Sequence, residues 1–268
     1  MRNLNDKVVA LTGAGSGIGR ALAITLANEG ASLALSDVNR RGLEETIAAI
    51  ETSRLVSSAV IDVSDKEAVE SWALDVVKDH GHVDAIINNA GVSAKGSVEN
   101  ISYEDMHWVM NINLWGVVHG VKAFLPHLKK RPEAVIVNIA SLNSFVPFPL
   151  NAPYNMAKCA IGGLSETLMQ ELRKTSIRVT CVFPGGIKTG IVENARNSTA
   201  KEAKDFSQIA KTTPEQAAHV IVRGMKRKKR RVFVGADAKL LTFAKRMLPM
   251  TTVWAFGRWF EPKTKKYG

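Results

Sequence analysis

Short apolar segments alternate with longer segments of mixed polarity along most of the chain. The short segments hold few charges and several are rich in Val and Ile, which is typical of strands buried on both faces of a sheet. The segments predicted as strands are Lys7–Thr12, Ser32–Ser36, Val56–Ile61, Ala85–Asn88, Ala134–Ala140, Arg178–Phe183 and Arg231–Val234.

The longer segments carry apolar residues at helical spacing. Ile18, Leu22 and Leu26, for example, recur every fourth position and share one helix face. Helices are predicted over Ile18–Asn28, Asp65–Lys78, Met106–Ala123, Tyr154–Leu172 and Pro214–Met225. Because strands and helices alternate, the predicted fold class is α/β, with a single Rossmann-like, doubly wound parallel sheet and helices on both of its faces.

The end of the chain differs from the rest in charge. Residues 221–268 hold 14 basic and 2 acidic residues, whereas residues 1–220 hold 22 and 23 and are nearly neutral. We therefore expect a main domain over residues 1–235 and a basic, amphipathic C-terminal helical extension over residues 236–268. Its apolar positions at helical spacing, before Pro249 ends the predicted helix, are Leu240, Leu241, Ala244, Met247 and Leu248, and the aromatic residues Trp254, Phe256, Trp259 and Phe260 follow.

Composition excludes several classes of protein. No apolar segment of a secretory signal follows the first residues, and no apolar run is long enough to span a membrane. Cys159 and Cys181 lie outside metal-binding and redox spacings, so we expect reduced thiols in a cytoplasmic protein. His80 and His82 lack a third ligand nearby and are expected to be solvated, so no metal site is predicted.

A glycine-rich turn follows the first predicted strand. Glycines allow backbone amides to approach a pyrophosphate at a helix N-terminus, where the helix dipole favours negative charge. Ile18 stands where the third glycine of a G-x-G-x-x-G pattern would be, so a tight turn without ligand is the alternative. The candidate cofactor-binding residues here are Gly13, Ser16, Gly17, Ile18 and Gly19.

Polar residues at the ends of the next strands extend this candidate site. Asp37 ends the second strand, where a carboxylate binds ribose hydroxyls and repels the 2′-phosphate of NADP. NAD is therefore predicted over NADP, although Arg40 and Arg41 would favour NADP if they did not face solvent. Asp62, with Val63, is a candidate contact to the adenine or a cap for the next helix. The small and amide residues Asn89, Ala90 and Gly91 end the fourth strand and allow close approach of the cofactor.

A candidate catalytic group lies in the second half of the chain. Tyr154 and Lys158 are four residues apart at the start of a predicted helix and so point from one face. A nearby ammonium stabilises a phenolate, so we expect Lys158 to lower the pKa of Tyr154. Ser141 ends the fifth strand and would hydrogen-bond the reacting oxygen. Asn113 is a polar residue within an apolar helix and would hold a water that relays protons to Lys158.

Taken together, these motifs resemble the short-chain dehydrogenase/reductase family across about residues 5–190. The matching segments are Thr12–Gly19, Asn88–Gly91, the Asn-Leu-Trp-Gly segment that contains Asn113, Ser141, the Tyr154–Lys158 pair and Pro184–Gly190. The resemblance implies a Rossmann-like fold, a nicotinamide cofactor and an Asn–Ser–Tyr–Lys catalytic tetrad. It also implies that Tyr154 and Lys158 contact the cofactor, and that Pro184, Gly185, Ile187 and Thr189 line it. Family members usually pair as homodimers or homotetramers through helices that correspond here to Met106–Ala123 and Tyr154–Leu172.

We therefore predict an NAD(H)-dependent oxidoreductase that interconverts a hydroxyl and a carbonyl group, with Tyr154 as general acid/base. The apolar segment Leu142–Leu150 beside Ser141 predicts a lipophilic alcohol or ketone as substrate. The extension predicts peripheral contact with an anionic membrane, and a lid or a subunit contact is the alternative. The basic run Lys226–Arg231 lacks interleaved aromatic residues, so nucleic-acid binding is not expected. An NAD(H)-binding sensor or scaffold with little turnover, and an NADP(H)-dependent carbonyl reductase, remain the alternative functions.

Overall fold

The computed structural model describes residues 1–264 and contains one seven-stranded sheet. The strand order is β3-β2-β1-β4-β5-β6-β7, and every neighbouring pair is parallel. The chain builds the sheet outward from β1 in one direction and then in the other, so the order reverses between β1 and β4, where ligands bind in open sheets of this kind. The strands are β1 (Val8–Thr12), β2 (Ser32–Asp37), β3 (Val56–Val60), β4 (Ala85–Asn88), β5 (Ala134–Ile139), β6 (Ile177–Pro184) and β7 (Arg231–Val234).

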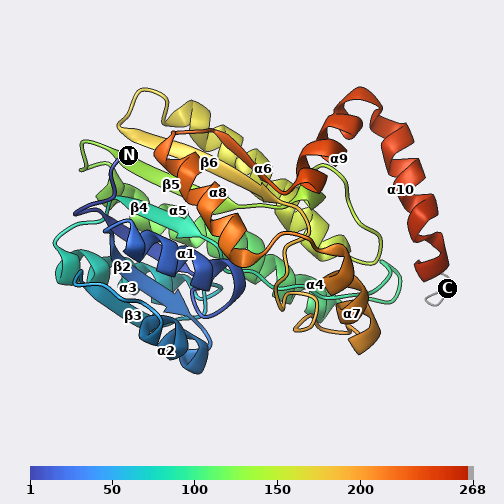
Figure 1. Ribbon diagram of the computed structural model, residues 1–268, viewed down its shortest axis with the longest axis horizontal. Helices are drawn as coiled ribbons and strands as arrows, with labels where there is room; N and C mark the ends of the chain where they lie inside the picture. The colour runs from blue at the N-terminus through green and yellow to red at the C-terminus, as the bar shows by residue number, and fades with distance from the viewer. Residues whose placement is uncertain (265–268) are drawn as a thin grey trace.

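Helices cover both faces of the sheet (Figure 1). On one face α1 (Gly17–Asn28), α2 (Arg40–Ala48) and α8 (Pro214–Lys226) contribute side chains to one apolar core with β1 and β2. On the other, α3 (Lys66–His80), α5 (Gly116–Leu128) and α6 (Ala152–Glu171) form a second core with the same sheet. The remaining helices are α4 (Tyr103–Met110), α7 (Ala200–Ile209), α9 (Ala236–Met247) and α10 (Pro249–Thr264).

The predicted fold class is confirmed, and all seven predicted strands are present within one or two residues of their expected ends. The predicted helix Met106–Ala123 is wrong as one regular helix. The residues form α4, a π-helical segment η1 (Asn111–Trp115) and then α5. A π turn inserts an extra residue into the helix and is frequent at functional sites. Here it brings Asn113, which is fully buried, to the carboxyl edge of the sheet.

The C-terminal extension forms two helices, not one. α9 begins before the predicted apolar stripe, and Pro249 is the first residue of α10, where proline is well tolerated because its missing amide hydrogen needs no partner. Figure 1 shows α9 and α10 standing apart from the helices that cover the sheet, on the side opposite the N-terminus. Within residues 1–264, no helix combines the length and the apolar character needed to cross a bilayer.

A buried carboxylate connects the amino ends of the central strands. Asp84, which is fully buried just before β4, accepts hydrogen bonds from the Val8 amide at 3.0 Å and from Arg131 Nε at 2.8 Å. Lys7 and His82 also pair with it. His80, in turn, contacts the Ser57 hydroxyl through Nε2. The expectation that His80 and His82 are merely solvated is therefore wrong, because both have protein partners.

The basic run Lys226–Arg231 lies at the amino end of β7, at the opposite edge of the sheet from the strand ends that carry the glycine-rich turn. Three of its cations pair with acidic residues of other elements, Lys226 with Glu29, Lys228 with Glu133 and Arg231 with Glu166. The run therefore lies at the end of β7 opposite to the start of α9, and half of its charge is neutralised locally.

Candidate active site

The glycine-rich turn packs closely against the end of β4. Gly13 has a φ of +67°, and a Cβ there would lie 2.7 Å from the Cα of Ala90. The Asn89 side chain donates to the carbonyls of Thr12 and Gly13, and the Thr12 hydroxyl accepts from the amides of Asn89 and Ala90. The residues predicted at the first and fourth strand ends are thus brought together, and Thr12 is a positioning residue that sequence reasoning passed over.

The N-terminus of α1 is left without a side-chain cap. Ser16 occupies the N-cap position but makes no capping hydrogen bond, whereas Asn39 caps α2 and Asp65 caps α3. Uncapped amides at a helix N-terminus, together with the helix dipole, form a binding site for an anionic group. Thr189 lies over this turn, since a Cβ on Gly17 would be 3.1 Å from its methyl group. Ile18 packs against the apolar core, and Gly19 packs against the Gly13 carbonyl.

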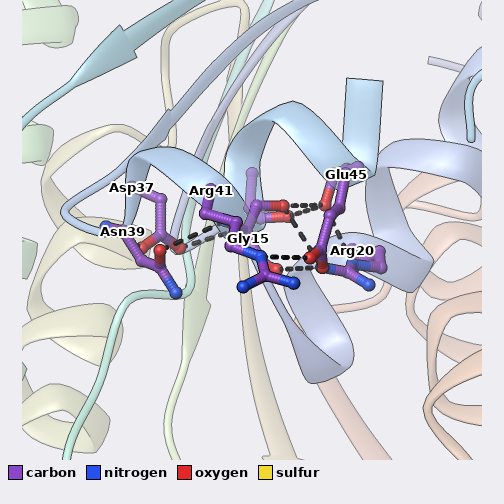
Figure 2. A network of polar contacts seen from close by, with 9 residues as sticks. Gly15, Arg20, Asp37, Asn39, Arg41 and Glu45 are labelled. Atoms are coloured by element: carbon purple, nitrogen blue, oxygen red, sulfur yellow. Dashed lines mark hydrogen bonds and ion pairs between the residues drawn. The ribbon is translucent and has the colours of Figure 1, made fainter. Parts of the chain in front are cut away.

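Asp37 faces the glycine-rich turn at the end of β2. Its carboxylate accepts from the Gly15 amide at 2.8 Å and from the Asn39 amide at 2.9 Å (Figure 2). Each carboxylate oxygen has two acceptor sites, so both oxygens keep capacity for further donors. Arg40 and Arg41 lie exposed in the first turn of α2.

The third strand end is arranged differently from the others. Asp62 accepts hydrogen bonds from the amide and the hydroxyl of Ser64, so it orders the turn before α3, and Asp65 is the residue that caps that helix. The Val63 side chain is buried against Gly116, and its carbonyl bonds His119. The Val63 side chain is therefore taken up by packing inside the fold.

The predicted catalytic side chains meet beyond the ends of β4 and β5. Lys158 is almost fully buried in α6, and its Nζ donates to the Ile139 carbonyl at 2.8 Å and lies 5.5 Å from the centre of the Tyr154 ring. A Cβ on Gly91 would lie 3.6 Å from that Nζ and 3.3 Å from Asn113 Oδ1. Ser141 hydrogen-bonds Tyr154, so the four residues of the predicted tetrad lie close to one another.

Burial is the largest influence on the pKa values of Tyr154 and Lys158. It raises the pKa of Tyr154, and a hydrogen bond from Ser141 offsets part of that rise. Burial also lowers the pKa of Lys158 to about 8. The expected lowering of the Tyr154 pKa by Lys158 is thus not seen in the protein alone, because removing a phenolate from water costs more than the Ser141 hydroxyl returns.

The Asn113 side chain bonds the backbone of Val92. Its Oδ1 accepts from the Val92 amide at 2.8 Å, and its Nδ2 donates to the Val92 carbonyl at 2.9 Å. The side chain therefore fastens the segment after β4 to the π turn, and one amide hydrogen and one acceptor site on Oδ1 remain for a further partner. That Asn113 holds a water that relays protons to Lys158 stays a prediction.

Ser141 is held by a network that sequence reasoning missed. Its Oγ accepts from the Asn143 amide at 3.1 Å, and the Asn143 side chain donates to Asn155 Oδ1 at 2.7 Å. Asn155 Nδ2 in turn donates to the Phe148 carbonyl. Asn155 is the residue after Tyr154, so this network couples the serine loop to the start of α6. A pair of asparagines near the serine and the tyrosine is its only signal in the sequence.

The loop after β6 is anchored by a residue of the C-terminal extension. Asp237, in the first turn of α9, accepts from the Gly186 amide at 2.7 Å, and it occupies the space that a Cβ on Gly185 would fill. Pro184 and Ile187 are buried beside it. The sequence shows Asp237 only as one of two acidic residues in a basic segment, so this contact between distant elements had no local signal.

Comparison with known proteins agrees with this geometry. The family model described as short chain dehydrogenase matches residues 7–200. The chain is 40% identical over 256 residues to a Mycobacterium tuberculosis protein named as the oxidoreductase SadH, covering 92% of this chain and 93% of that one. It is 35% identical over 213 residues to levodione reductase from Leifsonia aquatica, covering 76% and 80%.

A solved structure of a short chain dehydrogenase/reductase from Burkholderia phymatum, in complex with NAD, superposes with a TM-score of 0.84 at 28% identity and covers 94% of this chain and 96% of that chain. Sequence and structure therefore agree on a single family. The chain belongs to the short-chain dehydrogenase/reductase family.

Proposed function

We propose that this protein is an NAD(H)-dependent oxidoreductase that interconverts a hydroxyl and a carbonyl group. The observation that carries the proposal is the meeting of Tyr154, Ser141 and Lys158 at the edge of the sheet where the uncapped glycine-rich turn lies. The NAD-bound relative and levodione reductase support the same class of reaction and cofactor.

The residues present fit a dinucleotide. Gly13 and Gly17 have positive φ values, and Gly13 leaves no room for a side chain. Asp37 keeps free acceptor sites next to Gly15. We propose that the α1 turn holds the pyrophosphate and that Asp37 holds the adenosine ribose, while Asp62 and Val63 lie by the adenine. When bound, the cofactor supplies or accepts the hydride. The other proposed contacts to it are Ser16, Ile18, Gly19, Asn89, Ala90, Gly91, Tyr154, Lys158, Pro184, Gly185, Ile187 and Thr189.

The protein's own residues would handle the proton. Tyr154 would give a proton to the developing alkoxide, or take one from the alcohol, at its phenol oxygen. Ser141 would donate a hydrogen bond to the same substrate oxygen. The Lys158 ammonium would stabilise the phenolate, and its pKa of about 8 leaves it mostly protonated at pH 7. Asn113 would act as a positioning residue through Val92.

Cofactor preference tests the role of Asp37. We expect NADH to bind more tightly than NADPH, because a 2′-phosphate would face the Asp37 carboxylate. Asp37→Ala should bring the dissociation constants for NADH and NADPH closer to each other, and a titration of cofactor fluorescence measures both constants. If wild-type protein bound NADPH more tightly, the function would shift to the NADP(H)-dependent carbonyl reductase.

We further propose a lipophilic substrate. Fewer apolar residues are available to bind it than the sequence suggested. Leu142 and Val146 are buried in the core, and Phe145 packs against Phe183 and Phe233, so these residues serve the fold. The apolar residues left at the serine loop are Pro147, Phe148, Pro149 and Leu150, and the Phe148 ring lies 4.7 Å from that of Phe256 in α10. The extension therefore contacts the loop beside the reacting groups, as a lid would.

A series of secondary alcohols of increasing chain length tests the substrate class and the function together. Each methylene that is buried should raise kcat/KM by the equivalent of about 0.8 kcal/mol of binding free energy. A flat series, or a preference for short polar alcohols, would refute the lipophilic pocket. No turnover with any alcohol or ketone, in protein that binds NADH, would favour the sensor or scaffold.

We also propose that the extension contacts anionic membranes. On α9, Leu240, Phe243 and Met247 are each more than 60% exposed and lie at helical spacing, with Lys239 and Arg246 exposed beside them. Basic residues beside exposed apolar ones suit an interfacial helix. Flotation with anionic liposomes at low salt should recover the protein. Binding that is absent, or equal on neutral liposomes, would contradict the proposal.

We propose that copies of this chain assemble as other members of the family do. We expect a homodimer or homotetramer that pairs through η1–α5 and α6, and sedimentation at micromolar protein concentration measures it. Residues 236–268 would act as an extension of the catalytic unit at residues 1–235, since Asp237 joins α9 to the loop after β6.

A further inference from the structure

One carboxylate bridges two arginines beside the proposed ribose site. Glu45 of α2 pairs through Oε2 with Arg20 of α1 at 2.9 Å and through Oε1 with Arg41 at 3.1 Å. Figure 2 shows this network next to Asp37 and Gly15. The guanidiniums of Arg20 and Arg41 lower the pKa of the Glu45 carboxyl, so it is ionised at neutral pH. Positive charge thus stands beside a site that we propose to select against a phosphate.

The two arginines are held to different degrees. Arg20 donates through Nη2 to the carbonyls of Gly15 and Gly42, at 2.7 and 3.2 Å, and through Nε to the Thr46 hydroxyl at 3.0 Å. These bonds would keep Arg20 in place without Glu45. They also join the glycine-rich turn to α2, so Arg20 is a brace for that turn.

Arg41 depends on Glu45 alone. Its side chain is 89% exposed, and within residues 1–264 its one ionic partner is Glu45. It lies in the first turn of α2, whose N-cap Asn39 bonds Asp37 through its backbone amide. Without Glu45, the Arg41 guanidinium would lose this partner and be free to turn toward the Asp37 corner, as the exposed Arg40 side chain beside it already is. Guanidinium is the side-chain group that best matches a phosphate.

We propose that Glu45 is a specificity-determining residue, which selects NAD(H) by holding Arg41 away from the position of a 2′-phosphate. This proposal rests on the NAD(H) function above and adds a second source of cofactor selectivity to that of Asp37. Asp37 repels the phosphate directly, and Glu45 withholds the cation that would otherwise attract it. The residue acts on cofactor choice and takes no part in the proton chemistry.

Binding of NADH and NADPH to purified variants tests the proposal without any substrate. Glu45→Gln should bind NADPH about two- to fivefold more tightly, the scale of the one exposed ion pair that is released, and should bind NADH as the wild type does. Glu44→Gln is the matched control, since Glu44 is exposed on the same helix and its change removes the same charge. An equal gain in both variants would mean that net charge alone is responsible, and would overturn the proposal.

The role of Arg41 is tested in the same binding assay. Adding Arg41→Gln to Glu45→Gln should abolish the gain in NADPH affinity, whereas adding Arg40→Gln should leave most of it. Arg41→Gln alone should change little, because Glu45 already sequesters that side chain. A clear loss of NADPH affinity in Arg41→Gln alone, or a gain that survives in the double variant, would overturn the proposal.

The remaining outcomes separate this proposal from the proposed function. If Glu45→Gln weakened the binding of both cofactors equally, Glu45 would only stabilise the glycine-rich turn, and the selectivity role would be wrong. If wild-type protein failed to bind NADH, or Asp37→Ala left the cofactor ratio unchanged, the NAD(H) assignment would fail before Glu45 came into question.

Discussion

Replacing Tyr154 with phenylalanine is expected to lower kcat by roughly two to four orders of magnitude. NADH binding should change little, because the ring and the other proposed cofactor contacts remain. The phenylalanine ring fills the same space against Ala94, Ile101 and Val109, so the fold and the cofactor site should be preserved. What is lost is the hydroxyl that exchanges a proton with the substrate oxygen. Rates at saturating cofactor, together with NADH binding, provide the measurement.

Tyr103→Phe is the matched control for this change. Tyr103 is 81% exposed at the start of α4, so losing its hydroxyl should not alter turnover. If Tyr154→Phe kept near wild-type turnover with the best substrate, the role assigned to Tyr154 would be wrong. If it lost NADH binding as well, the phenol would be holding the cofactor, and the fall in kcat would not report on proton transfer.

Replacing Asp84 with alanine is expected to lower the free energy of unfolding by about 2–4 kcal/mol. The change leaves the buried Val8 amide without its acceptor and removes the partner that Arg131, Lys7 and His82 share. The loss should stay below that for a fully buried ion pair, because the Arg131 and Lys7 side chains still reach solvent.

Urea unfolding at one fixed protein concentration measures this effect, since any oligomer makes stability depend on concentration. Asp75→Ala on α3 is the control, because Asp75 is exposed and its loss should cost less than about 0.5 kcal/mol. A loss of less than about 1 kcal/mol for Asp84→Ala would show that the cluster contributes little to holding β1 and β4 together.

Much of the candidate site was predictable because it consists of strand ends. In a parallel sheet the carboxyl ends of all strands lie at one edge, so motifs far apart in the sequence meet there once the strands are identified. This brings Gly13, Asn89 and Ser141 to the same edge. Tyr154 and Lys158 were predictable as a pair because helical spacing places residues four apart on one face.

The structure determined the hydrogen-bond partners and the burial of individual polar residues. Asn113 was recognised as an unusual polar residue in an apolar helix, but its side chain bonds the Val92 backbone. A π turn sets that orientation, and regular helical periodicity does not anticipate one. Likewise, the pKa of Tyr154 depends on how completely the fold removes it from water, which no spacing along the chain specifies.

The sequence by itself determined the order of strands and helices, the edge at which the motifs gather and the family. These properties follow from local periodicity and from the fixed geometry of a parallel sheet. Only the tertiary structure decided which charged groups face each other. Asp237 reaches the loop after β6, and Glu45 joins Arg20 of another helix to Arg41 of its own. Such contacts depend on how elements pack, because an ion pair requires two side chains within a few ångströms whatever their separation in sequence.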